Sequence, residues 1–250
     1  MREPGSPALA RSPLGRRTLS YMSPAAGPSA GRSAALSWGT LAGPLFVTAF
    51  TAIGARRPGY DWRRLPVSSL ALGHHGWLQR ANFMVAGALY CYASRELGRG
   101  PRRRVGPRVV PLLVGGVGIG LVGSGVFATD PVGGFPPPTS GEEGIPLVGA
   151  GDSGPTLGGR LHNLFAIPII AGIPVAALTS AAPAVRGRDC RWAAYSVGSA
   201  ISVLGTFALF AAALAPSSRL AHVGGIFQRL SIGVGFGWLS ALSVRASRTP

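Results

Sequence analysis

The feature that most constrains this chain is a series of six apolar stretches, each long enough to cross a membrane as a helix. A hydrocarbon core about 30 Å thick requires about 20 helical residues. Only 13% of all residues are charged, against roughly 25% in soluble domains, and most of them lie in the links between the stretches. The sequence therefore predicts an all-α protein with a bundle of six transmembrane helices over residues 34–245. The six stretches are 35–55, 77–95, 108–128, 161–183, 192–214 and 223–244.

Two of these stretches are weaker, because each contains an arginine near its start. Arg80 interrupts the second stretch and Arg229 interrupts the sixth. A charged side chain within a membrane is costly unless it is paired or hydrated. A count of four or five spans is the alternative.

The segments outside the bundle are polar. Residues 1–33 carry five arginines among Pro, Ser, Gly and Ala, without apolar periodicity, which is typical of a disordered tail. Residues 246–250 form a short second tail. Translation starting at Met22 instead of Met1 would remove most of the first tail.

Every basic residue is an arginine, and the arginines favour one side of the predicted bundle. The two tails and the links after the second and fourth stretches carry sixteen, whereas the links after the first, third and fifth carry five. Cytoplasmic segments carry the excess of basic residues, so we predict a plasma-membrane protein with both termini in the cytoplasm. The link 129–159 contains four acids and no arginine, as expected of an exported loop.

The same distribution decides which partners we expect. A formal net charge of +16 suggests nucleic acid only when the basic residues cluster on a soluble face or in a tail. Here most arginines lie between apolar stretches, so the predicted partner is the lipid bilayer and not nucleic acid. We also expect the arginine-rich tail to contact anionic lipid, at about 1 kcal/mol per arginine near the surface.

The third stretch carries a small residue at every fourth position, at Gly116, Gly120 and Ser124. Small residues on one helix face let another helix approach closely. We expect that neighbour to belong to the same bundle, and contact with a second copy of the chain is the alternative.

Polar residues gather where the predicted helices meet the outer interface. Because several helices place ionisable groups in one layer, and such groups are costly there unless paired, we expect a shared polar cluster. Its candidate members are Asp61, Arg80, Asp130, His162, His222, Gln228 and Arg229.

Three interpretations of this cluster remain open. In the structural one, Asp130 neutralises Arg80 or Arg229 and holds helix ends together. In the second, Asp130, His162 and His222 bind a zinc ion with one position left for water, as in a hydrolase acting on lipid or envelope substrates. In the third, the arginines bind an anion or a lipid headgroup.

The overall prediction is a structural or binding protein of unassigned activity. A transporter of small solutes or lipids is a further alternative, although transporters often contain internal repeats and the sequence contains no convincing one.

Five short motifs lie at the outer ends of the predicted helices. They are Pro58-Gly59-Tyr60-Asp61, Val67-Ser68-Ser69-Leu70, Phe127-Ala128-Thr129-Asp130-Pro131, Gly159-Arg160-Leu161-His162 and Gly225-Ile226-Phe227-Gln228-Arg229-Leu230. In this order they resemble the motifs of the family called domain of unknown function 998 (DUF998). The resemblance extends from about residue 38 to residue 244 and implies a bacterial or archaeal integral membrane protein with six spans and no assigned activity.

Overall fold

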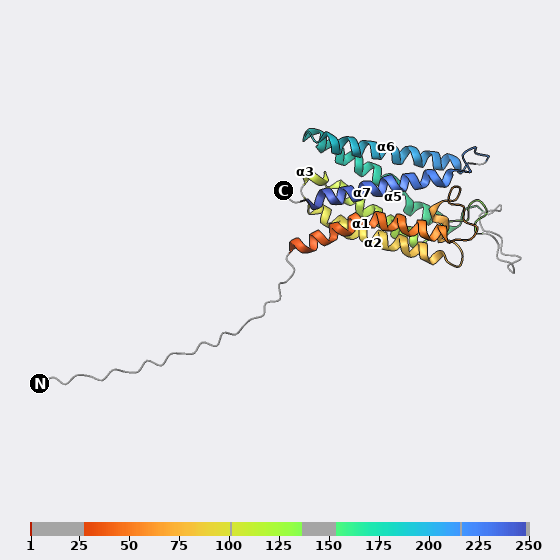
Figure 1. Ribbon diagram of the computed structural model, residues 1–250, viewed down its shortest axis with the longest axis horizontal. Coiled ribbons are helices and arrows are strands. Elements are labelled where there is room, and N and C mark those ends of the chain that lie inside the picture. The colour runs from red at the N-terminus through yellow and green to blue at the C-terminus, as the bar shows by residue number, and fades with distance from the viewer. Residues whose placement is uncertain (2–27, 101, 137–153, 216, 249–250) are drawn as a thin grey trace.

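The fold is entirely helical in the part of the chain that the computed structural model describes, which comprises Met1 and residues 28–100, 102–136, 154–215 and 217–248 (Figure 1). The predicted all-α class is confirmed for these residues. Most of the predicted tail 1–33, Met22 and the central part of the predicted exported loop lie outside them.

Each predicted apolar stretch corresponds to one long helix. These helices are α1 (Pro28–Ala55), α2 (Gly76–Gly98), α4 (Val109–Val126), α5 (Leu157–Arg186), α6 (Cys190–Ala213) and α7 (Gly224–Ser247). Two short elements were not predicted, the 3-10 helix η1 (Val67–Ala71) and the single turn α3 (Arg102–Val105).

The first helix begins inside the segment that we predicted as tail. Proline is well tolerated at the first helical position, and α1 starts at Pro28. Alanine has the highest helix propensity, so the small residues that follow extend the apolar helix toward the N-terminus.

The six long helices form a closed ring in the order α1, α2, α4, α5, α6 and α7, and α7 packs back against α1. Because the helices alternate in direction, the start of α1 and the end of α7 lie at one end of the ring, the terminal end (Figure 1). The described parts of the connections 56–75, 127–156 and 214–223, which leave out residues 137–153 and 216, lie at the opposite end, the loop end.

Within the described residues, four helical segments are long and apolar enough to cross a membrane by length and composition, namely Ala34–Ala55, Val109–Val126, Leu157–Arg186 and Cys190–Ala213. Many large apolar side chains on the outside of the ring are exposed, as expected of helices that face lipid. Examples are Leu45, Val85, Leu112, Ile119, Ile167, Leu178 and Ile201. The first two turns of α2 and α7 contain Gln79, Arg80, Asn82, Gln228 and Arg229, which lowers their hydropathy.

Glycines on α4 let it approach both of its neighbours in the ring. A Cβ atom at Gly118 would lie 2.7 Å from the Gly87 carbonyl oxygen of α2, and one at Gly123 would lie 2.1 Å from the Phe165 ring of α5. Of the three residues for which we predicted packing, Gly120 lies tightly against α5, because a Cβ atom there would be 2.5 Å from the Phe165 carbonyl oxygen, whereas Gly116 packs loosely and Ser124 lines a cavity.

Hydrogen bonds and one ion pair at the terminal end connect α5, α6 and α7. Asp189 accepts a hydrogen bond from the Trp192 backbone amide at the start of α6 and pairs with Arg245 of α7 at 2.6 Å. These two interactions hold the pKa of the Asp189 carboxyl below its usual value. The Trp192 indole donates to the Ser180 hydroxyl of α5 at 2.9 Å.

The close contact between α2 and α4 gives a first prediction. The substitution Gly118→Ala should destabilise the purified protein by about 1 to 3 kcal/mol, because the added methyl group overpacks the contact. Gly116→Ala is the matched control on the same helix, where the nearest atom would be Pro168 Cβ at 3.9 Å. Thermal unfolding in detergent measures both, and equal effects of the two substitutions would contradict the packing described here.

Candidate functional site

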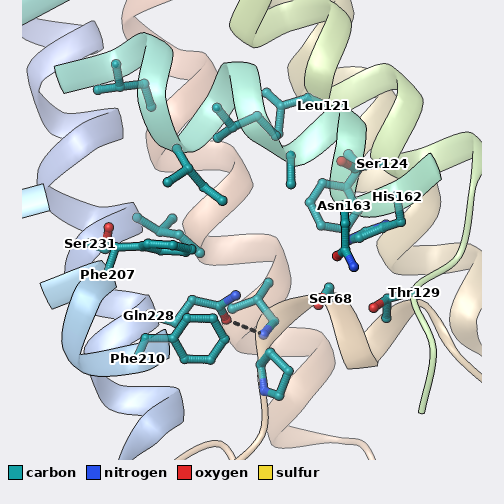
Figure 2. Close-up of a pocket in the computed structure, with 18 of the residues that line it drawn as sticks. Ser68, Leu121, Ser124, Thr129, His162, Asn163, Phe207, Phe210, Gln228 and Ser231 are labelled. Carbon is teal, nitrogen blue, oxygen red and sulfur yellow. Dashed lines mark hydrogen bonds between the residues drawn. The ribbon is translucent and has the colours of Figure 1, made fainter. Parts of the chain in front are cut away.

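A cavity of about 340 Å³ lies inside the ring toward the loop end, and all six long helices contribute to its wall. One part of the wall is apolar, with Phe46, Phe83, Ile173, Val203 and Phe236 among its residues. The other part is polar. Figure 2 shows Ser124, His162, Asn163, Ser68 and Thr129 on one side of the cavity, and Gln228, Ser231, Phe207 and Phe210 on the other.

His162 lies in the second turn of α5, where it is only 5% exposed. Its Nδ1 atom is 2.9 Å from the Phe127 carbonyl oxygen at the end of α4. A carbonyl can only accept, so Nδ1 donates, and in the uncharged ring Nε2 is then an acceptor. The ring also lies edge-on to Phe83 of α2, so His162 links α5 to both α2 and α4.

Asp130 follows α4 and holds the beginning of α5. Its carboxylate accepts hydrogen bonds from the backbone amide and the hydroxyl of Thr156, at 3.2 and 2.5 Å. Thr156 in turn accepts from the Gly159 amide as the N-cap of α5. A negative charge at a helix N-terminus is favourable, and Gly159 leaves room for it because a Cβ atom there would lie 2.0 Å from the carboxylate.

Arg80 stabilises the end of α4. Its guanidinium donates from Nε to the Gly125 carbonyl at 2.9 Å and from Nη2 to the Val126 carbonyl at 2.8 Å. The last carbonyls of a helix lack partners within the helix, and Arg80 of α2 supplies the donors from outside.

Arg229 also donates hydrogen bonds to backbone carbonyls, and these hydrogen bonds hold the connection 56–75 against α7. It donates to the Leu65 and Gly225 carbonyls at 3.1 and 2.9 Å and to the Tyr60 hydroxyl at 2.5 Å. Burial raises the pKa of the Tyr60 hydroxyl, and Arg229 opposes that rise. The protonated hydroxyl can therefore accept from Arg229 while it donates to the Pro66 carbonyl at 3.0 Å.

The predicted pairing of Asp130 with Arg80 or Arg229 is wrong. Within the described residues the ion pairs are Glu96 with Arg99 and Asp189 with Arg245, both remote from the cavity. The physical reason is that backbone carbonyls next to each guanidinium, and donors on Thr156 next to Asp130, satisfy these groups locally.

The other candidates occupy different positions. Gln228 lines the cavity and accepts a hydrogen bond from the Val67 amide at 2.7 Å (dashed in Figure 2). Asp61 is exposed and accepts from the Arg63 amide. His222 is exposed in the connection 214–223 and does not line the cavity.

The structure does not gather the three proposed zinc ligands. Asp130 and His162 both line the cavity, but His222 does not. No group of three His, Cys, Asp or Glu side chains within the described ranges is close enough together to hold a metal ion.

Polar cavity residues that were not selected from the sequence include Ser68, Ser124, Thr129 and Ser231. Ser124 is 1% exposed, and its hydroxyl has no hydrogen-bond partner among the described residues. It ends a run of small residues that predicted only helix packing, so composition gave no signal for it. Ser68 and Thr129 lie within two of the short motifs at the helix ends.

The model of the family described as "Protein of unknown function (DUF998)" matches residues 40–245. This chain belongs to the DUF998 family. The match covers all of α2 to α6 and most of α1 and α7, and it includes every cavity residue named above. Neither a curated protein nor a solved structure matches the chain. DUF998 membership thus agrees with a multi-pass membrane protein of unassigned activity.

The contacts of Arg229 give a second prediction. Tyr60→Phe removes the hydroxyl that accepts from Arg229 and donates to Pro66, and it should lower the free energy of unfolding by about 1 to 3 kcal/mol. Tyr92→Phe is the control, because the Tyr92 ring on α2 is exposed. Thermal unfolding of both variants measures the difference, and an unchanged Tyr60→Phe protein would mean that these hydrogen bonds do not stabilise the loop end.

Proposed function

We propose that this DUF998 protein spans the membrane six times and binds an amphipathic, lipid-like ligand in its central cavity. The observation that carries the proposal is that the cavity wall combines apolar side chains with polar ones. Its volume of about 340 Å³ lies within the range of roughly 300 to 1,000 Å³ typical of small-molecule sites.

The exposure of individual wall residues supports entry from the side. Asn163 on α5 and Leu214 at the end of α6 line the cavity, and both are exposed. Phe207 of α6, also in the wall, is half-buried. The cavity therefore reaches the surface between α5 and α6, two helices with a span-like composition, and a ligand dissolved in the bilayer could enter there.

Six spans are favoured by the ring itself. The helices α2 and α7 have 23 and 24 residues, which exceeds the length that a bilayer core requires. Each of them packs between two of the four span-like helices. Their arginines near the loop end donate to carbonyl oxygens, which lowers the cost of placing a charge there.

The orientation follows from the arginines. The terminal end carries most of them, so we infer that both termini are cytoplasmic and that the cavity opens toward the outer leaflet. The presence of Asp130 at the loop end agrees with this assignment.

Cysteine labelling tests the orientation. In a Cys91→Ser protein, the exposed Cys190 at the start of α6 should react with a membrane-impermeant maleimide only after the cells are permeabilised. In a protein that lacks both native cysteines, Ala221→Cys beyond the other end of α6 should react in intact cells. The reverse pattern would overturn the orientation, and reaction of both sites from one side would show that α6 does not span.

Filling the cavity tests the binding function. Ala166→Phe places a ring in the cavity wall of α5 and should weaken the binding of monooleoylglycerol at least about tenfold. Ala171→Phe is the matched control, because Ala171 is exposed on the same helix and does not line the cavity. Native mass spectrometry of the detergent-solubilised protein measures both affinities, and equal affinities would refute binding in the cavity.

A further inference from the structure

We infer that the polar part of the cavity recognises an uncharged lipid head that carries a hydroxyl group, and that it discriminates against phosphate and carboxylate heads. This inference rests on the proposed binding function. It goes beyond that function because it names the chemistry of the head that the cavity accepts.

The first observation is the unpartnered hydroxyl of Ser124. Buried polar groups in proteins nearly always form hydrogen bonds, and one without a partner costs free energy. Ser124 is almost fully buried, its Oγ atom lacks a partner among the described residues, and it lines the cavity. A hydroxyl on the ligand can both donate to and accept from this group.

The second observation is the orientation of His162. Its Nδ1 atom is held by the Phe127 carbonyl, so Nε2 of the uncharged ring remains as the acceptor. An imidazole buried beside an aromatic ring is more stable uncharged than charged. His162 therefore offers the ligand an acceptor, which suits a hydroxyl head and not a deprotonated anion.

The third observation is the absence of a cation for an anionic head. Arg80 and Arg229 donate to carbonyl oxygens at the loop end, and neither of them is part of the cavity wall. Among the described residues that line the cavity, Asp130 is the one with a formal charge, and this charge is negative. An anionic head would thus be buried without a counter-charge and next to a carboxylate, which is unfavourable.

Asp130 is also poorly placed to attract a cationic head. Both of its oxygens accept hydrogen bonds from Thr156, and Gly159 packs directly against the carboxylate. The remaining polar groups named on the wall, on Ser68, Thr129, Asn163 and Ser231, are uncharged, so an uncharged head matches the chemistry of the wall.

Four single-chain lipids with the same or a closely matched hydrocarbon chain test the inference on the full-length protein. They are monooleoylglycerol, its phosphate monoester, oleate and oleylamine, and native mass spectrometry or a fluorescence titration compares their affinities. We expect monooleoylglycerol to bind at least about tenfold more tightly than each of the charged lipids. Equal or tighter binding of any charged lipid overturns the inference.

Two variants separate the failure of the inference from the failure of the proposed function. If Ala166→Phe weakens a charged lipid as strongly as it weakens monooleoylglycerol, and the charged lipid binds more tightly, the cavity binds lipid but the head assignment is wrong. If Ala166→Phe changes the affinity of none of the four lipids, the binding function itself is refuted.

Ser124→Ala tests the role of the unpartnered hydroxyl. Because Ser124 Oγ is buried without a hydrogen-bond partner within the described residues, its removal should not lower the thermal unfolding temperature, while it lowers the affinity for monooleoylglycerol about three- to tenfold. 1-Octadecene, which has neither a donor nor an acceptor, should not lose affinity in the same way. Ser243→Ala, at a buried serine of α7 that does not line the cavity, is the control.

An unchanged affinity of the Ser124→Ala protein for monooleoylglycerol would contradict the assignment of this hydroxyl to the head. Equal losses of affinity for monooleoylglycerol and for 1-octadecene would contradict it too, because they would indicate a change in cavity shape.

Discussion

The loop end of the ring depends on one constraint, which is that the backbone carbonyls at the ends of membrane helices need hydrogen-bond donors where little water is present. Arginine supplies several donors in a fixed plane, and the chain uses it accordingly. Arg80 satisfies the last carbonyls of α4, and Arg229 holds the connection 56–75 against α7. His162 contributes a further donor, to Phe127. Arg80 and Arg229 thus stabilise the loop end without lining the cavity, whereas His162 both holds the end of α4 and lines the cavity.

These hydrogen bonds determine which polar groups line the cavity. The guanidinium groups of Arg80 and Arg229 donate to backbone carbonyls and are not part of the wall. The wall therefore contains hydroxyl and amide groups together with one carboxylate, that of Asp130, which accepts hydrogen bonds at the start of α5. The close packing of α4 against α2 and α5, made possible by Gly118 and Gly123, fixes one side of the wall. The exposed lining residues, Asn163 and Leu214, lie on α5 and at the end of α6. This arrangement agrees with the ligand entry that we propose.

The helices could be predicted from the sequence because hydropathy over about 20 residues reflects the thickness of the bilayer directly. The layer of polar residues could also be predicted, since Asp130, His162 and Gln228 lie at helix ends on the same side. The hydrogen-bond partners of Arg80 and Arg229 could not be predicted, because every residue carries a backbone carbonyl. The sequence does not distinguish the carbonyls of Gly125, Val126 and Leu65, which accept these hydrogen bonds, from the others. A charged pair is the simplest expectation when only side chains are considered, and it is wrong for Asp130 for this reason. Ser124 was missed because a serine in a run of glycines has the composition of a packing face.

Closure of the ring by its last helix has a consequence for how the protein is made. Chains are synthesised from the N-terminus, so α1 is inserted long before α7, the neighbour that completes its packing. Until α7 arrives, α1 and α6 each lack one lateral partner, and the wall lacks Gln228, Ser231 and Phe236. The cavity is therefore completed only after α7 has been synthesised. A chain truncated before α7 would retain the other five long helices and still lack part of the cavity wall.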